Sequence, residues 1–146
     1  GVDGLGIGSL YVNTYYKGKI PMPHILWIIS RCMHLASWLE YSKLMYGGFF
    51  TENLYIDPEG HTVSLLGGWW YSHQKDQKLT IADGRFMDVV PSRLLGAAKP
   101  IMDRYLIRRL AGELMGDPSG NALIHNKDIP RKYLIFELKL YRWKKH

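Results

Sequence analysis

The clearest alternation of apolar and polar positions lies between Pro23 and Lys43. Apolar residues recur there at every third or fourth position, the spacing of one face of an amphipathic helix. These positions are Ile25, Ile28, Ile29, Cys32, Leu35, Ala36 and Leu39. Pro21 and Pro23 suit a helix start, because the first turn needs no backbone N–H donor. We therefore predict a long helix from about Pro23 to Lys43, followed by a break at Gly47 and Gly48.

A hairpin is predicted next. Two short apolar runs, Leu54–Ile56 and Thr62–Leu66, flank the sequence Asp57-Pro58-Glu59-Gly60. Proline presets the dihedral angle of a tight turn and glycine accepts positive φ, so this sequence favours a chain reversal. Between Gly67 and Asp88, glycine, charged and aromatic residues follow no steady period. We expect most of that region to be loop.

A second long helix is predicted from about Pro100 to Met115, with Asp103 in its first turn, where the helix dipole favours a negative charge. Glycine and proline in residues 116–120 end it. The apolar pattern from Pro130 to Trp143 fits either a third helix or a strand. The expected fold class is mainly α with a small β-hairpin. We expect residues 1–20 to be extended or flexible and residues 21–146 to form one domain.

Composition narrows the class of protein. A chain of 146 residues with 47% hydrophobic and 13% aromatic residues can bury the core of one domain. It contains no apolar run near the roughly 18 to 20 residues that a membrane span requires, so we expect a soluble, intracellular protein with no membrane partner. The single cysteine, Cys32, cannot form an internal disulfide and is expected to be buried. The start at Gly1 suggests a processed, truncated or partially sequenced product.

The order of predicted elements and the segment Leu39–Leu66 resemble the large lobe of protein kinases. In that family a catalytic loop close to HRDLKPEN precedes two apolar residues, a turn and DFG, and Glu52 and Asn53 match the end of the loop. The resemblance covers about residues 9–116 and implies a kinase C-lobe-like fold. We expect no N-lobe, because only about twenty residues precede the first predicted helix and no predicted strand there carries a VAIK-type lysine.

The resemblance implies that the catalytic groups are missing. It places Tyr46 at the family's histidine, Gly47 at its arginine and Gly48 at the aspartate that accepts the substrate proton. Phe50 replaces the lysine, and Asn53 matches the asparagine that helps hold the second magnesium ion.

With one extra turn residue, Gly67 stands where the metal-holding aspartate would be. Phosphoryl transfer depends on metals and positioned charge, so Gly48 and Gly67 imply that the chain is not an enzyme and has no cofactor. Asn53 is then either a residual cofactor ligand or, as we favour, a residue that braces its loop. Asp103 resembles the buried aspartate that opens the large central helix and braces the catalytic loop, which is a structural role.

Two surfaces are candidate interaction sites. Trp69, Trp70 and Tyr71 lie where an active kinase holds its metal, and they either pack into the vacated cleft or anchor a partner protein, since such side chains are enriched at interface hot spots. The second surface is basic, and its proposed contacts are Arg131, Lys132, Lys139, Arg142, Lys144 and Lys145. For that segment, which lies in a chain of net charge +6, a solvated helix face is the explanation that we favour over a binding surface.

The leading functional hypothesis is a non-catalytic, pseudokinase-like interaction or scaffold module that binds a protein partner within a larger assembly. The alternative is a nucleic-acid-binding accessory protein that uses the basic C-terminal segment with Tyr133, Tyr141 and Trp143. A third hypothesis is a residual nucleotide-binding enzyme completed by a partner chain. The six histidines show no HExxH-type pairing, so no zinc site is expected.

Overall fold

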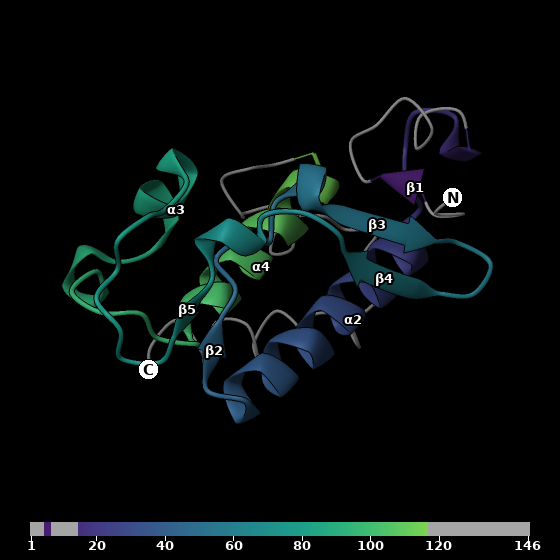
Figure 1. The fold of residues 1–146 in the computed structure, drawn as a ribbon. Helices are drawn as coiled ribbons and strands as arrows, with labels where there is room; N and C mark the ends of the chain where they lie inside the picture. The colour runs from purple at the N-terminus through teal and green to yellow at the C-terminus, as the bar shows by residue number, and fades with distance from the viewer. Residues whose placement is uncertain (1–4, 7–14, 117–146) are drawn as a thin grey trace.

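The computed structural model describes residues 5–6 and 15–116, which contain three α-helices and two small antiparallel sheets (Figure 1). The elements in chain order are β1 (Leu5–Gly6), α2 (Met22–Tyr41), β2 (Leu44–Met45), β3 (Leu54–Asp57), β4 (Thr62–Leu65), β5 (His73–Gln74), α3 (Gly84–Val89) and α4 (Met102–Leu114). Short 3-10 turns lie at Thr51–Asn53, Trp69–Tyr71 and Ser92–Leu94. The segment Pro130–Trp143, predicted as helix or strand, lies outside the described residues.

The long helix α2 confirms the first prediction, with bounds that differ by one or two residues. Its apolar stripe is buried as the spacing indicated, and Cys32 is fully buried within it. The helix begins after Pro21, which has extended backbone angles, and ends where Lys43 takes a φ of +59°. That turn sends the chain back into β2.

The predicted hairpin is confirmed as β3 and β4, which pair in antiparallel register with Leu54 opposite Leu65 and Ile56 opposite Val63. In the turn, the backbone N–H of Glu59 donates to Asp57 Oδ1 at 3.1 Å. The third strand of this sheet was not expected. Leu5 and Gly6, in the segment predicted to be extended or flexible, pair with Ile56 and Tyr55 on the other edge of β3.

The region Gly67–Asp88 has more structure than the sequence predicted. Strand β5 pairs with β2 across the loop, so that Met45 lies opposite His73, and α3 begins at Gly84. The side chain of Asp83 caps α3 by accepting the N–H of Arg85 at 2.8 Å, and Phe86 anchors the helix in the core. Most of the region is loop, as predicted, but a six-residue helix with one buried residue is too short to produce an apolar period, so the sequence did not predict α3.

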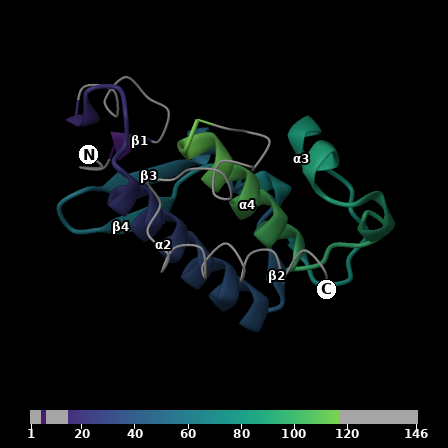
Figure 2. The same cartoon turned by 180° about the vertical axis from the view of Figure 1, so that it is seen from behind.

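The core lies between α2, α4 and the inner face of the three-stranded sheet (Figures 1 and 2). The predicted second long helix is confirmed as α4, which runs beside α2 in both views. Its buried side includes Tyr105, Leu106, Ile107 and Leu110. Among the described residues, no helix combines the length and apolarity that crossing a membrane would take. The fold holds the loop that follows β2 between α4 and the hairpin.

Candidate functional site

Asp103 connects the start of α4 to the loop after β2. Its carboxylate is buried and accepts the backbone N–H of Tyr46 at 2.8 Å through Oδ2 and that of Gly47 at 2.7 Å through Oδ1. Burial raises the pKa of Asp103 to about 7, while the two N–H donors and the positive charge of Arg104 act in the opposite direction. The side chain therefore supplies acceptors for two buried donors at the beginning of the loop.

The ring of Tyr46 fills the space beside Gly48. A Cβ atom on Gly48 would lie 2.7 Å from Tyr46 Cζ and 2.8 Å from Cε1, closer than real side chains approach. The Tyr46 hydroxyl donates a hydrogen bond to the carbonyl oxygen of Gly67, and its ring packs against Phe49 and Trp69 at centroid distances of 5.0 and 4.5 Å. Burial, with a smaller contribution from Asp103, raises the pKa of Tyr46, so the hydroxyl keeps its proton.

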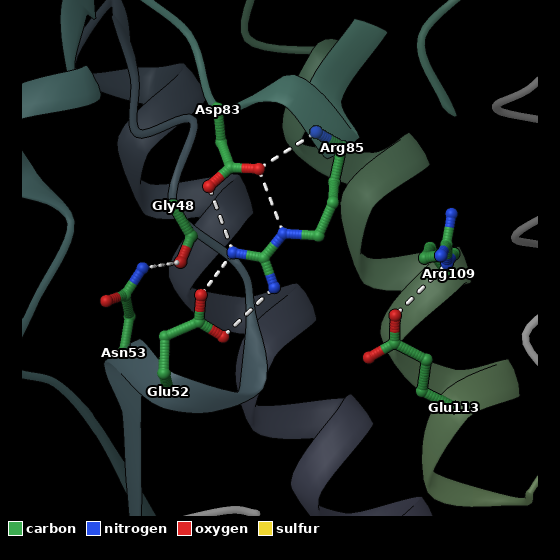
Figure 3. Close-up of polar contacts among 7 residues, drawn as sticks. All are labelled: Gly48, Glu52, Asn53, Asp83, Arg85, Arg109 and Glu113. Atoms are coloured by element: carbon green, nitrogen blue, oxygen red, sulfur yellow. Dashed lines mark hydrogen bonds and ion pairs between the residues drawn. The ribbon is translucent and has the colours of Figure 1, made fainter. Parts of the chain in front are cut away.

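Asn53 closes the other side of the same space. Its side-chain Nδ2 donates to the carbonyl oxygen of Gly48 at 3.0 Å, and the residue is buried (Figure 3). A Cβ on Gly67 would lie 2.7 Å from Asn53 Oδ1, and a Cβ on Gly68 would lie 2.5 Å from Asn53 Nδ2. Asn53 is therefore held against three glycines and braces the loop in this structure.

These contacts determine what the site can do chemically. The positions that the kinase resemblance assigns to the catalytic base and to the metal-holding aspartate, Gly48 and Gly67, have neither a carboxylate nor room for one. Tyr46 and Asn53 occupy the space on either side of them. Across the described ranges, no group of three or more His, Cys, Asp or Glu side chains is arranged to hold a metal ion.

An ion-pair cluster beside this loop was missed by the sequence analysis. The Arg85 guanidinium lies between Asp83 and Glu52 (Figure 3), with Nε donating to Asp83 Oδ1 at 2.9 Å and Nη1 to Glu52 Oε2 at 3.2 Å. It also lies over the ring of Phe50 at 4.1 Å from the centroid. Hydrogen bonds from Arg85 lower the pKa values of Glu52 and Asp83. The available signal was Asp83 before Gly84 and Arg85, a helix N-cap pattern.

The aromatic cluster predicted at Trp69–Tyr71 is partly packed and partly exposed to solvent. Trp69 follows Gly68, which has a φ of +75°; its ring packs on Tyr46, and its Nε1 donates to the carbonyl oxygen of Leu65 at 2.8 Å. Trp70 points outward and is 64% exposed, while Tyr71 is half-buried beside it. Trp69 therefore helps to fill the space around the loop, and Trp70 offers a large exposed aromatic surface.

The six basic residues predicted as contacts, Arg131, Lys132, Lys139, Arg142, Lys144 and Lys145, lie outside the described residues, as do Tyr133, Tyr141 and Trp143. No contact among the described residues therefore bears on the nucleic-acid alternative.

Comparison with known proteins gives no family for the chain. No protein-family model matches it, and no curated protein is similar to it in sequence. The function is therefore inferred from the geometry of the chain's own residues.

Proposed function

We propose that this chain is a non-catalytic, pseudokinase-like interaction module. The observation that carries the proposal is the position of Tyr46. Its ring covers Gly48, and its hydroxyl is bound to Gly67, so the two backbone positions that would hold the base and the metal ligand are joined by a tyrosine side chain. Phosphoryl transfer requires positioned carboxylates and metal ions at those positions.

The kinase-like part of the proposal is supported by the bracing of the loop. The resemblance assigns Asp103 to a buried aspartate that opens a central helix and holds the catalytic loop, and Asp103 accepts two N–H groups from the loop at Tyr46 and Gly47. The hairpin after the loop and the pairing of β2 with β5 enclose the same segment. A braced loop without catalytic groups is expected where the scaffold has been retained for binding.

The binding part of the proposal is supported by exposed aromatic side chains near the filled site. Trp70 is 64% exposed and Trp69 is 42% exposed, and Trp38 on α2 is 61% exposed. Large apolar side chains that remain in contact with water are enriched at protein interfaces, where their burial contributes much of the binding free energy. We infer that a protein partner covers part of this surface, and that the protein acts by binding.

The proposal is tested by measuring the melting temperature of the purified chain with and without magnesium and millimolar ATP. A ligand that binds only the folded state raises the melting temperature, by an amount that grows with the logarithm of the ligand concentration above the dissociation constant. We expect no magnesium-dependent shift, with an active protein kinase as the positive control in the same assay. A clear rise in the presence of both ligands, reduced by Asn53→Ala, would show a working nucleotide site and overturn the non-catalytic assignment.

A further inference from the structure

An apolar groove runs between α2 and β4, on the side of the hairpin away from β1. It has a volume of about 230 Å³. Its lining residues carry no charge: Leu35, Trp38, Leu39, Val63, Ser64, Leu65 and Trp69. Trp38 is 61% exposed although it lies next to other apolar side chains. The fold therefore leaves an apolar surface beside β4 that the described residues do not cover.

The edge of strand β4 that borders this groove pairs with no other strand among the described residues. The described sheet has the order β1-β3-β4, so β4 has a neighbour on one side only. The N–H of Leu66 donates to the carbonyl oxygen of Asn53 at 3.0 Å. Since hydrogen-bonded and non-hydrogen-bonded residue pairs alternate along an antiparallel ladder, this bond determines which residues of β4 direct their backbone groups toward β3. The backbone groups of Thr62 and Ser64 point toward β3, and those of Val63 and Leu65 point away from it.

These outward groups are mostly unsatisfied within the described residues. The carbonyl oxygen of Leu65 accepts the Nε1 of Trp69, but the N–H groups of Val63 and Leu65 and the carbonyl of Val63 have no partner there. An open row of N–H and C=O groups beside an apolar surface is the arrangement that accepts an added strand in peptide-binding domains.

We propose that this groove binds an extended segment of another polypeptide, which pairs with Val63 and Leu65 of β4 and places alternate apolar side chains against Leu35, Trp38 and Trp69. The inference rests on the proposed function, because it assigns a partner class to the interaction module. Main-chain hydrogen bonds would supply affinity, and the apolar groove would select the side chains.

Charge at one end of the groove defines the partner further. Arg31 and His34 are exposed on the side of α2 that also carries Trp38, since Arg31 lies seven positions and His34 four positions before Trp38. The Nε of Arg31 donates to the carbonyl oxygen of His61 at 3.0 Å, which holds the guanidinium at the start of β4. An acidic residue on the bound segment would complement that end, and in an antiparallel segment it lies toward the C-terminus.

The test uses the whole 146-residue chain and a displayed library of random nine-residue peptides. We expect enrichment of peptides with apolar residues at alternate positions and Asp or Glu toward the C-terminus. The enriched peptide is then synthesised with a fluorescent label, and its dissociation constant is measured by anisotropy at fixed salt.

Three variants examine the three parts of the site. Val63→Pro removes an N–H that points away from β3 and leaves the hydrogen bonds to β3 in place. Trp38→Ala removes an aromatic side chain that lines the groove. Each variant should raise the dissociation constant of the selected peptide at least tenfold. Arg31→Glu should weaken binding about fivefold, and only for peptides with the acidic residue. Met87→Ala is the matched control, because Met87 is a large exposed apolar residue on α3 that does not line the groove. Circular dichroism checks that each variant is folded. If Val63→Pro does not fold, Trp38→Ala alone tests the groove.

The outcomes separate the alternatives. A selection that yields no peptide sensitive to both Val63→Pro and Trp38→Ala overturns the inference. A concentration-dependent dimer that Val63→Pro abolishes would show that a second copy occupies the groove, which overturns the proposed occupant. If the chain binds neither peptides nor magnesium-ATP, only this inference is wrong. If the chain binds peptides and magnesium-ATP also raises its melting temperature, the non-catalytic assignment is wrong and the peptide-binding groove is confirmed.

Discussion

At the scale of single residues, Asp103 is the group that makes the loop at Tyr46 sensitive to pH. It is 1% exposed, and both carboxylate oxygens accept backbone N–H groups. Burial has the larger effect and raises its pKa to about 7, compared with about 3.9 for an exposed aspartate. The folded protein therefore binds a proton at Asp103 between about pH 4 and pH 7, whereas the unfolded chain does not. Protonation stabilises the fold in that window, and this contribution is lost as the pH rises toward 7.

The variant Asp103→Asn tests this sign. The amide offers one acceptor oxygen where the carboxyl group offers two, so one buried backbone N–H loses its partner. We expect a loss of about 1–3 kcal/mol in the free energy of unfolding at pH 5. The loss should shrink as the pH rises to 7, because the wild-type protein is itself destabilised there. Urea unfolding of both proteins at pH 5, 6, 7 and 8 measures the difference in the free energy of unfolding. If the loss caused by Asp103→Asn grows with pH, the folded protein holds Asp103 as a carboxylate with a lowered pKa.

The residues of the site were only partly predictable from the sequence. The absence of carboxylates at Gly48 and Gly67 could be stated from the local match, and the structure places Asp103 and Asn53 against the same loop. The position of the Tyr46 ring could not be predicted from the sequence. It depends on the absence of a Cβ atom at Gly48 and on a hydrogen bond to the carbonyl oxygen of Gly67, 21 residues further along the chain. The Arg85 contact with Glu52 likewise joins residues 33 positions apart. Such contacts follow from tertiary packing.

At the scale of elements, the turn after β4 depends on Gly68. Its φ of +75° lies in the left-handed region, and a Cβ would lie 2.5 Å from Asn53 Nδ2. We expect Gly68→Ala to lower the free energy of unfolding by roughly 1–2 kcal/mol from the backbone alone, with a further loss from displacing Asn53. Gly84→Ala is the matched control, since it opens α3, has no atom within 4 Å of its added Cβ and should be neutral or slightly stabilising. Equal effects in chemical denaturation would contradict the role of Gly68.

The elements differed in how well the sequence predicted them, for a physical reason. Helices α2 and α4 contain 20 and 13 residues, enough to show a repeated apolar face, and the hairpin contains a strong turn sequence. Strands β1, β2 and β5 have two residues each, so no alternation can appear in them. Their pairing is set by where the longer elements place the chain. The sequence therefore predicted the elements that form the core and missed the short pairings that position the loop.

At the scale of the whole molecule, the packing of α2 with α4 and the sheet determines whether the domain unfolds as one unit. Cys32, the only cysteine in the chain, lies within this core on α2 and is 0% exposed. Burial raises its pKa to about 12, so the folded protein holds it as an unreactive thiol. A thiol reagent can then modify Cys32 only when α2 separates from its neighbours, and the modification rate reports that opening.

We expect Cys32 in the native protein to react with a thiol reagent at the rate for the unfolded chain multiplied by the fraction of molecules unfolded. The free energy obtained from that ratio should equal the free energy of unfolding measured with urea, because the thiol is not accessible to smaller fluctuations. The control is Cys32→Ala combined with Ser37→Cys, which places the thiol at an exposed position of the same helix and should react at nearly the unfolded rate. If the free energy obtained from Cys32 is well below the urea value, α2 opens while the rest of the domain stays folded, and the groove beside β4 is lost at each opening. If the two free energies are equal, one cooperative core holds both the groove and the loop after β2.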